Sequence, residues 1–200
     1  KLGEARCNMK KIYKDIVCDE NKKILWITIN RPKVLNAMSL SCVNEMIVAI
    51  EEANSNQNIR VIIICGSGER AFTSGADIKE IKNYSGTEMD PYNRRWIKLF
   101  SIIEKSPKPV IAAVNGFATG GGTEMSLACD FVVASDTAKF GLAEINIGVI
   151  PGAGAAVRLT RWVGRLKAKE ILMLGRQITG HEAVAMGLAN ECVTSDQLKE

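Results

Sequence analysis

The stretch that decides the fold is Pro109-Val-Ile-Ala-Ala-Val-Asn-Gly-Phe-Ala-Thr-Gly-Gly-Gly-Thr-Glu124. Its apolar beginning, residues 109–114, predicts a strand, and residues 122–129 predict a short helix. The glycines between them remove side chains where a ligand would meet the main chain, and the free N–H groups of a helix start attract negative charge. We therefore expect a glycine turn that brings Glu124 close to a ligand.

A second glutamate, Glu144, lies in Phe140-Gly-Leu-Ala-Glu144, shortly before Pro151-Gly-Ala-Gly154. Two carboxylates can divide the work of an acid and a base when their surroundings hold them in different protonation states. Taken alone, Glu124 would be a first-turn glutamate beside a helix dipole, and Glu144 would be a solvated surface charge. The interpretation as an acid–base pair therefore depends on both glutamates lying next to glycine-containing turns, not on either glutamate alone.

A third segment is Ala71-Phe-Thr-Ser-Gly-Ala-Asp-Ile-Lys-Glu80, which follows the apolar run at residues 61–65. That run is typical of a buried parallel strand, and chemistry often lies just past the carboxyl end of such a strand. Read locally, Asp77 fits the cap of a following helix and Lys79 fits a surface position. We expect the turns and the two glutamates to meet at one crevice.

In this order and spacing, the segments resemble the crotonase family, also called the enoyl-CoA hydratase/isomerase family, and most of all an enoyl-CoA hydratase. Residues 30–38, Asn30-Arg-Pro-Lys-Val-Leu-Asn-Ala-Met38, look like the family's N-terminal signature, while residues 71–80 and 109–130 look like its two oxyanion segments. The resemblance runs over residues 24–193. It implies an α/β fold, a crotonase-like spiral of repeated β-β-α units, with residues 1–200 as a single core domain.

The resemblance also implies the roles of individual residues. The backbone N–H groups of Ala76 and Gly121 would hold the oxyanion of a CoA thioester. Glu124 would chiefly activate water, and Glu144 would protonate the α-carbon. Bound coenzyme A would lie along a set of residues from both oxyanion segments, with residues 33–37 as another wall. That set is Ala76, Asp77, Ile78, Lys79 and Gly121.

Three functions are compatible with this resemblance. The first is enoyl-CoA hydration, the reversible syn addition of water that gives a 3-hydroxyacyl-CoA, with no cofactor beyond the CoA of the substrate. The second is Δ3-Δ2 enoyl-CoA isomerisation or another reaction of the family, and the third is non-catalytic binding of acyl-CoA or RNA. The paired glutamates favour the first. Thr119 and Thr123 stand where larger apolar residues or cysteine are frequent in the family, which leaves the acyl preference open.

Composition agrees with a globular core of one domain, since 46% of the 200 residues are hydrophobic and 24% are charged. The net charge of +4 comes without a basic run, so we expect no nucleic-acid partner. Six scattered cysteines and the lone His181 offer no metal-ligand spacing, and we expect no metal site. No apolar stretch approaches the ~20 residues of a membrane span. We expect a cytoplasmic protein, or a mitochondrial-matrix protein if a targeting peptide has been removed.

Apolar periodicity predicts alternating strands and helices. The predicted strands are residues 23–30, 61–65, 109–114 and 131–135, and the predicted helices are residues 39–53, 92–104, 122–129, 155–163 and 166–174. Thr179 and Glu182 have capping-box spacing before a further helix. The family implies C-terminal helices that mediate oligomer contacts, which we expect to be missing here, and a homotrimer or a dimer of trimers.

Overall fold

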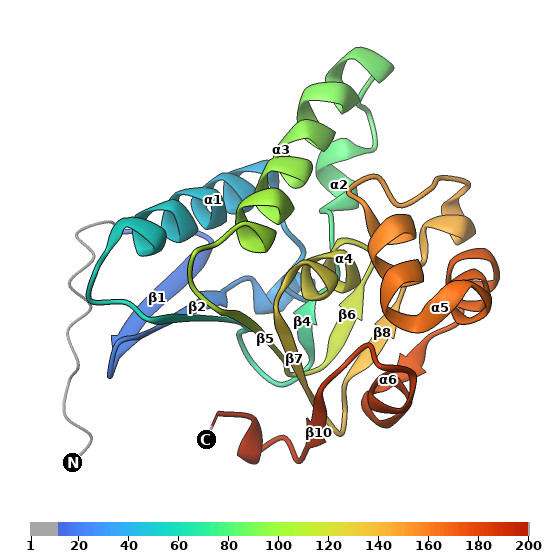
Figure 1. Cartoon of the computed structure of the whole chain (residues 1–200). Coiled ribbons are helices and arrows are strands. Elements are labelled where there is room, and N and C mark those ends of the chain that lie inside the picture. Colours follow the sequence, from blue (N-terminus) through green and yellow to red (C-terminus); the bar gives the residue numbers. More distant parts are fainter. Residues whose placement is uncertain (1–11, 200) are drawn as a thin grey trace.

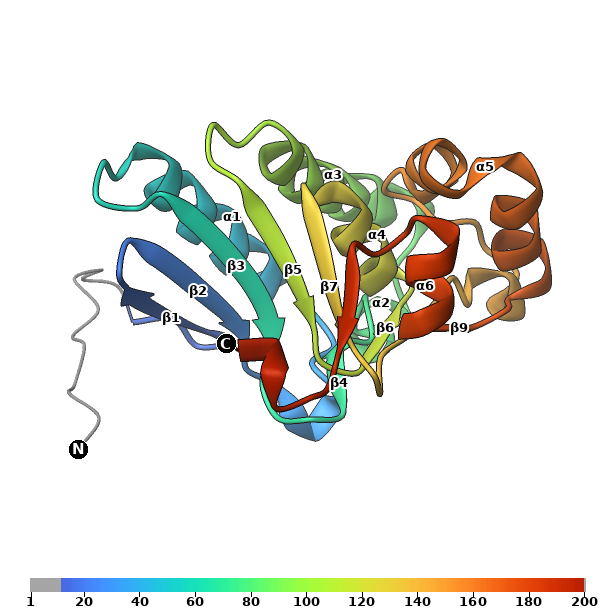
Figure 2. The ribbon, with the colours of Figure 1, turned by 60° about the horizontal axis from the view of Figure 1, so that its bottom comes forward.

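A six-stranded sheet runs through the computed structural model, which describes residues 12–199 (Figures 1 and 2). Its strand order is β1-β2-β3-β5-β7-β10, and only the β1–β2 pair is antiparallel. The strands are β1 (Ile16–Asn21), β2 (Ile24–Ile29), β3 (Val61–Gly66), β5 (Val110–Val114), β7 (Phe131–Ser135) and β10 (Glu191–Val193).

A second, four-stranded sheet has the order β4-β6-β8-β9. Its strands are β4 (Ala71–Thr73), β6 (Phe117–Thr119), β8 (Lys139–Gly141) and β9 (Ile178–Thr179). Each of β3, β5 and β7 leads into a short strand of this sheet and then into a helical segment, so the chain winds as successive β-β-α turns. The predicted α/β spiral is confirmed. The short strands β4, β6 and β8 were not predicted, because three residues carry too little periodicity.

The helices lie on one face of the large sheet and beside the small sheet (Figure 2). α4 contacts strands of both sheets and therefore stands where the two sheets meet. The helices are α1 (Leu40–Ser55), α2 (Ile78–Ile81), α3 (Gly86–Glu104), α4 (Gly121–Ala128), α5 (Ala155–Leu174) and α6 (Gly180–Met186), and the 3₁₀ turns are η1 (Pro32–Val34), η2 (Glu144–Ile147) and η3 (Gln197–Lys199).

The core forms because β2 alternates strictly: Leu25, Ile27 and Ile29 are fully buried, and their neighbours are only partly buried. α1 presents a complementary apolar stripe toward this face, since residues three and four apart share one side of a helix. Its buried members are Cys42, Val43, Met46, Ile47, Ala49, Ile50 and Ala53. At 25 cal/mol per Å² of apolar area, a buried side chain of this size stabilises the fold by roughly 1.5–3 kcal/mol.

Two predictions differ from the structure by more than two residues at a helix boundary. α3 begins at Gly86 rather than at residue 92, because Ser85 and Glu88 form a capping box ahead of Pro91 and the helix continues through the proline. The two helices predicted over 155–174 form one element, α5, with a non-helical kink at Gly164 (φ +77°). The capping box of Thr179 and Glu182 at the start of α6 is confirmed.

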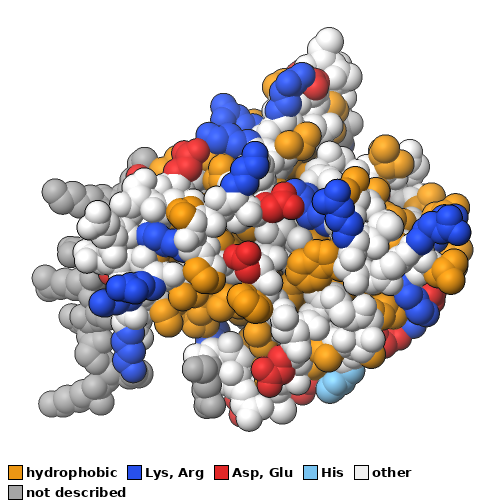
Figure 3. All heavy atoms as spheres, in the orientation of Figure 1, with side chains coloured by type: hydrophobic (Ala, Val, Ile, Leu, Met, Phe, Trp, Pro, Cys, Tyr) orange, Lys and Arg blue, Asp and Glu red, His pale blue; other side chains and the backbone are white. Residues whose placement is uncertain are grey.

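Charged side chains of both signs are interspersed on the face seen in Figure 3, with apolar side chains between them. No helix within residues 12–199 is both long and apolar enough to cross a membrane. His181 is exposed at the start of α6, as its local sequence predicts. Cys65 and Cys129 are buried among apolar side chains, and burial raises the pKa of both thiols.

Candidate active site

Glu124 is held inside the protein by the main chain of a distant loop. It lies in the first turn of α4, which starts after Gly120 at a φ of +53°, a backbone conformation that favours glycine. The side chain is 4% exposed, and its Oε1 accepts hydrogen bonds from the N–H groups of Ala153 and Ala155, both at 3.0 Å. Within residues 12–199 no donor bonds Oε2, so this oxygen is available to a ligand.

Burial raises the pKa of Glu124 to about 6 from the ordinary 4.5. The amides of Ala155 and Ala153 oppose this rise because they stabilise the charged form, and so does the guanidinium of Arg158. The nearby carboxylate of Glu144 adds to the rise, so Glu144 is close enough to influence the titration of Glu124. Glu124 is therefore poised to exchange a proton near neutral pH.

Glu144 occupies the first position of η2 and reaches the same glycine turn. Its Oε1 lies 3.0 Å from the position that a Cβ on Gly120 would take, so a side chain there would displace the carboxylate slightly. Its Oε2 is buried and has no hydrogen-bond partner among the described residues. Burial raises the pKa of Glu144, and its own backbone N–H partly opposes this rise. An unpartnered buried oxygen favours the protonated acid.

The two segments that the resemblance identifies with an oxyanion hole, residues 71–80 and 109–130, meet at the same place. A Cβ on Gly75 would lie only 2.8 Å from the backbone nitrogen of Gly121. Ala76 forms a parallel bridge with Met38, in which the Met38 N–H donates to Gly75 and the Asp77 N–H donates to Met38. The N–H groups of Ala76 and Gly121 themselves have no acceptor in the described part of the chain. Two neighbouring backbone donors are thus free for a ligand.

Trp96 of α3 forms a wall behind Gly121 that sequence reasoning missed. Its Cζ3 would lie 2.8 Å from a Cβ on Gly121, so this position must remain glycine for the indole to pack there. Trp96 is 4% exposed and stands between Tyr92 and Phe100, with ring centroids 6.3 and 5.7 Å away. The spacing of these aromatic residues by four positions was the available signal, since it places them on one helix face.

The match to a family model decides the affiliation of this chain. The model described as enoyl-CoA hydratase/isomerase matches residues 19–200. The chain belongs to the enoyl-CoA hydratase/isomerase family. Its relatives include the crotonyl-CoA hydratase of Syntrophomonas wolfei, 40% identical over 93% of this chain and 72% of the relative. The short-chain-enoyl-CoA hydratase of Clostridium acetobutylicum is 39% identical over 92% of this chain and 70% of the relative.

Solved structures of the family have the same fold. The enoyl-CoA hydratase from Bacillus anthracis superimposes with a TM-score of 0.91 at 38% identity, over 93% of this chain and 72% of that one. A further match, the DspI protein of Pseudomonas aeruginosa, has a TM-score of 0.92 at 26% identity, over 96% of this chain and 74% of that one. Family membership and fold therefore agree from independent comparisons.

The segment predicted to follow coenzyme A has a clear local structure. Asp77 caps α2 by accepting the N–H of Lys79 at 3.2 Å, so its reading as a helix cap is confirmed. Asp77 also pairs with Arg31 at 3.1 Å, which ties this segment to the N-terminal signature. Ile78 is 53% exposed, and Lys79 is exposed as predicted. Both side chains are therefore available to a ligand that lies beside Ala76.

The cradle of Glu124 was missed as well. Ala153 and Ala155, whose amides hold Glu124, were not singled out, and neither was Arg158, which donates to the carbonyl of Ala153 at 2.8 Å and pairs with Glu104 at 2.9 Å. The only sequence signal for these amide donors was the glycine-rich run at residues 151–154 before a helix, where main-chain donors become available. No sequence pattern connects that run to a glutamate about thirty residues earlier.

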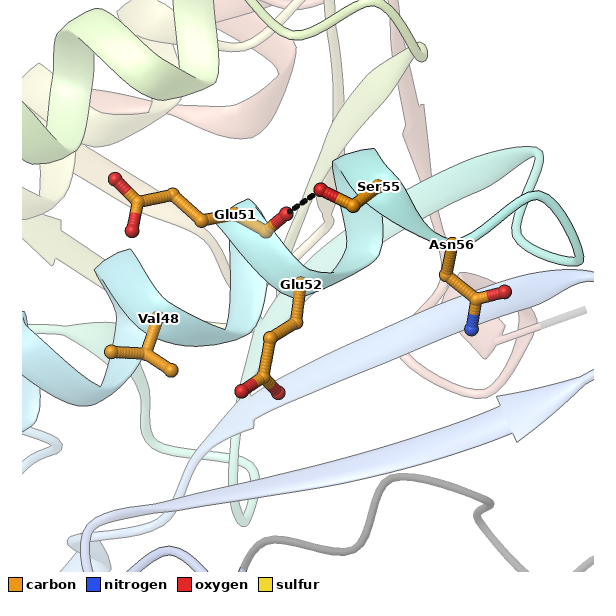
Figure 4. Close-up of a pocket in the computed structure, with 5 residues that line it drawn as sticks. All are labelled: Val48, Glu51, Glu52, Ser55 and Asn56. Atoms are coloured by element: carbon orange, nitrogen blue, oxygen red, sulfur yellow. Dashed lines mark hydrogen bonds between the residues drawn. The ribbon is translucent and has the colours of Figure 1, made fainter.

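Two other features lie outside this site. A hollow of about 530 Å³ beside the C-terminal half of α1 is lined by Val48, Glu51, Glu52, Ser55 and Asn56 (Figure 4). None of these residues belongs to α4, η2 or the glycine turn, so the hollow is separate from the glutamate pair. Within residues 12–199, no group of three or more His, Cys, Asp or Glu side chains is arranged to hold a metal ion.

Proposed function

We propose that this chain is an enoyl-CoA hydratase, which adds water reversibly across the α,β-double bond of an enoyl-CoA thioester to give a 3-hydroxyacyl-CoA. The observation that carries the proposal is the meeting of Glu124 and Glu144 at one glycine turn. Hydration needs two proton transfers, one from water and one to carbon, and two glutamates with raised pKa values suit that need. The related crotonyl-CoA and short-chain-enoyl-CoA hydratases support it.

The N–H groups of Ala76 and Gly121 would hold the thioester oxygen as it becomes enolate-like. Both donors are free and lie on neighbouring segments, and Gly121 is the first residue of α4, where the helix dipole adds positive potential. Fixed donors cost no reorganisation when charge develops, so they stabilise the transition state more than the substrate. The acyl group would then extend from this point between the two glutamates.

The surroundings of the two carboxyl groups suggest how they divide the work. Glu124 has a pKa of about 6 and two amide donors on Oε1, so at neutral pH it is mainly ionised and able to take a proton from water. Glu144 has a buried, unpartnered Oε2, which suits the protonated form that donates to the α-carbon. Because the two groups interact, the pH profile would report apparent pKa values of the pair.

We further propose that coenzyme A lies along Asp77, Ile78 and Lys79, with residues 33–37 opposite. The Met38–Ala76 bridge and the Arg31–Asp77 ion pair join these two segments, which supports a common binding surface. Lys79 would offer its charge to a phosphate group of the ligand. The reaction would need no cofactor, since coenzyme A arrives as part of the substrate.

Self-association and a cytoplasmic location complete the proposal. Ile145, Ile147, Val149 and Ile150 are exposed side by side in sequence, from 47% to 85%, and such a run of exposed apolar side chains is typical of an interface. We propose a homotrimer or a dimer of trimers. Cys42, Cys65, Cys129 and Cys192 are free thiols, which supports a reducing compartment such as the cytoplasm.

The decisive experiment follows the loss of absorbance of the conjugated thioester in crotonyl-CoA and in a medium-chain enoyl-CoA. We expect turnover on the short substrate at neutral pH without added metal or cofactor. Failure to hydrate either substrate, together with conversion of a Δ3-enoyl-CoA to its Δ2 isomer, would overturn the hydratase assignment in favour of an isomerase.

A further inference from the structure

Thr123 is a fully buried residue of α4 whose hydroxyl group touches two strands of the small sheet. Its Oγ1 lies 2.6 Å from the carbonyl oxygen of Ala118 in β6 and 3.0 Å from that of Gly141 in β8. The N–H of Gly141 in turn donates to Oγ1 at 3.1 Å. A hydroxyl carries one proton, so we take the short contact to Ala118 as its donated bond and Gly141 as its donor.

The segments joined by this hydroxyl carry the parts of the site. Ala118 leads into the turn that ends at the free N–H of Gly121, and Thr123 itself directly precedes Glu124. Gly141 ends β8 and leads into Glu144. The N–H of Gly120 donates to the carbonyl of Gly141 at 2.9 Å. The Thr123 side chain therefore links the segments that carry Glu124, Glu144 and the N–H of Gly121.

We propose that Thr123 is a positioning residue for hydration, whose hydroxyl group fixes the glycine turn and the Glu144 segment relative to α4. This inference rests on the proposed hydratase function and adds a residue to it. Thr123 does not touch the reacting atoms; it acts through the backbone of Ala118 and Gly141. Removing the hydroxyl leaves buried main-chain groups short of a partner, so the two strands can shift relative to α4.

The same helix offers a matched control. Ser126 is also fully buried, and its hydroxyl donates to the carbonyl of Thr123 at 2.8 Å, within α4. It bonds neither β6 nor β8. Removal of this hydroxyl therefore tests the general cost of losing a buried hydrogen bond in α4, without loosening the link between the strands that lead to Gly121 and Glu144.

The experiment compares Thr123→Val, Thr123→Ser and Ser126→Ala in the hydration of crotonyl-CoA, with thermal unfolding of each variant. Thr123→Val keeps the shape and removes the hydroxyl. We expect its kcat to fall by about 10- to 10²-fold with little change in KM, because displacements near 1 Å are enough for such losses. Thr123→Ser should keep near-wild-type kcat, and Ser126→Ala should lower the unfolding temperature without a comparable loss of kcat.

Near-wild-type kcat in Thr123→Val, or an equal loss in Ser126→Ala, would overturn the proposal. If Thr123→Val does not fold, Thr123→Ala replaces it, because the alanine side chain has no hydrogen-bonding group. Its kcat should then fall below that of Thr123→Ser, and equality between the two would also overturn the proposal.

A second measurement separates this inference from the proposed function. Butyryl-CoA has no double bond to hydrate, and its bound thioester carbonyl can be followed by vibrational spectroscopy. In the wild type the carbonyl stretch should lie well below its value in water, and in Thr123→Val it should move back toward that value. If the wild type fails to hydrate crotonyl-CoA, the proposed function fails, and this shift still decides the role of Thr123. An identical stretch in both proteins would overturn that role.

Discussion

Glu124 and Glu144 are the same residue type, but the protein presents them in opposite ways. Glu124 lies on α4, where every residue from 122 to 128 is buried, and two backbone amides donate hydrogen bonds to its Oε1. Glu144 begins a 3₁₀ turn, and exposed apolar side chains lie within and just after this turn, among them Ile147 at 62% and Ile150 at 85%. One carboxyl group is fixed by the core, and the other is held at the edge by a surface segment.

This difference indicates which changes in the protein would displace each carboxyl group. The position of Glu124 is determined by the core packing of α4 and by the loop at residues 151–155, so small changes elsewhere should move it little. The position of Glu144 depends on short turn contacts, such as the N–H of Val149 donating to the carbonyl of Glu144 at 3.1 Å. A partner that covers the exposed segment would steady Glu144 more than Glu124.

The largest expected effect is on turnover when either carboxyl group is removed. Glu124→Gln and Glu144→Gln should each lower kcat for crotonyl-CoA hydration by roughly 10²–10⁴-fold, the usual contribution of a general acid or base. The double variant should be little worse than the poorer single variant, because groups that act as a unit are not additive.

Circular dichroism should confirm that these variants keep the fold. Near-wild-type turnover in either one would contradict a shared role of the two glutamates. Survival of isomerisation in one variant, with hydration lost, would favour the Δ3-Δ2 isomerase alternative.

The next largest effect is expected on kcat when a methyl group is added at Gly121, on the side that faces Trp96. Gly121→Ala would place a Cβ 2.8 Å from Cζ3 of Trp96, so either the indole or the backbone amide proposed as an oxyanion donor must move. Loss of one such donor typically costs ~10²–10³-fold in kcat. Trp96→Leu in the same protein should restore part of the activity by making room.

Gly86→Ala is the control, because a Cβ at Gly86 would meet nothing within 4 Å. It should leave crotonyl-CoA hydration unchanged. Full activity in Gly121→Ala would mean that the amide of Gly121 plays no part in binding the thioester oxygen.

A smaller effect concerns stability and pH. Burial raises the folded-state pKa of Glu124 from 4.5 to about 6, so the folded protein binds this proton more tightly than the unfolded chain does. That contribution is fully present below pH 4.5 and is lost as the pH rises through 6. Glu124→Gln cannot ionise, so at pH 8 it should be more stable than the wild type by about 2 kcal/mol.

Urea unfolding at pH 8 and at lower pH measures this difference, which should shrink as the pH falls toward 4.5. Glu88→Gln is the opposite case, since the hydrogen bonds from Ser85 lower the pKa of Glu88 and its charge supports the folded state. A Glu124→Gln variant less stable than the wild type at pH 8 would show that its amide bonds outweigh its burial.

The smallest effect on the fold is expected at the exposed segment. Ile147→Ser should change the free energy of unfolding by no more than about 0.5 kcal/mol, as is usual for surface positions. Leu142→Ala, at a residue only 1% exposed, should cost roughly 2–5 kcal/mol. If the segment is an oligomer interface, Ile147→Ser should instead weaken self-association.

Light scattering at micromolar concentration tests that last point. The wild type should be larger than a monomer, and Ile147→Ser should shift it toward one. A monomeric wild type would contradict the proposed trimer, and an unchanged oligomer in Ile147→Ser would place the interface elsewhere.

Local patterns in the sequence located most of the elements of the fold. The apolar run at 131–135 coincides with β7, and the capping signals of Asp77 and Thr179 were correct because a cap depends on residues only two or three positions away. The early start of α3 was missed, because the capping box of Ser85 and Glu88 begins the helix ahead of Pro91.

By itself, then, the sequence determined the family, the alternation of strands and helices, and both glutamates, since these depend on short motifs and on periodicity. Only the tertiary structure decided what surrounds the glutamates. The amides of Ala153 and Ala155 and the indole of Trp96 come from segments far from Glu124 in the chain, and the Thr123 hydroxyl joins α4 to Gly141 in β8. Such contacts arise when α4 packs between the sheets, and a single sequence carries no local pattern for a pairing made across space.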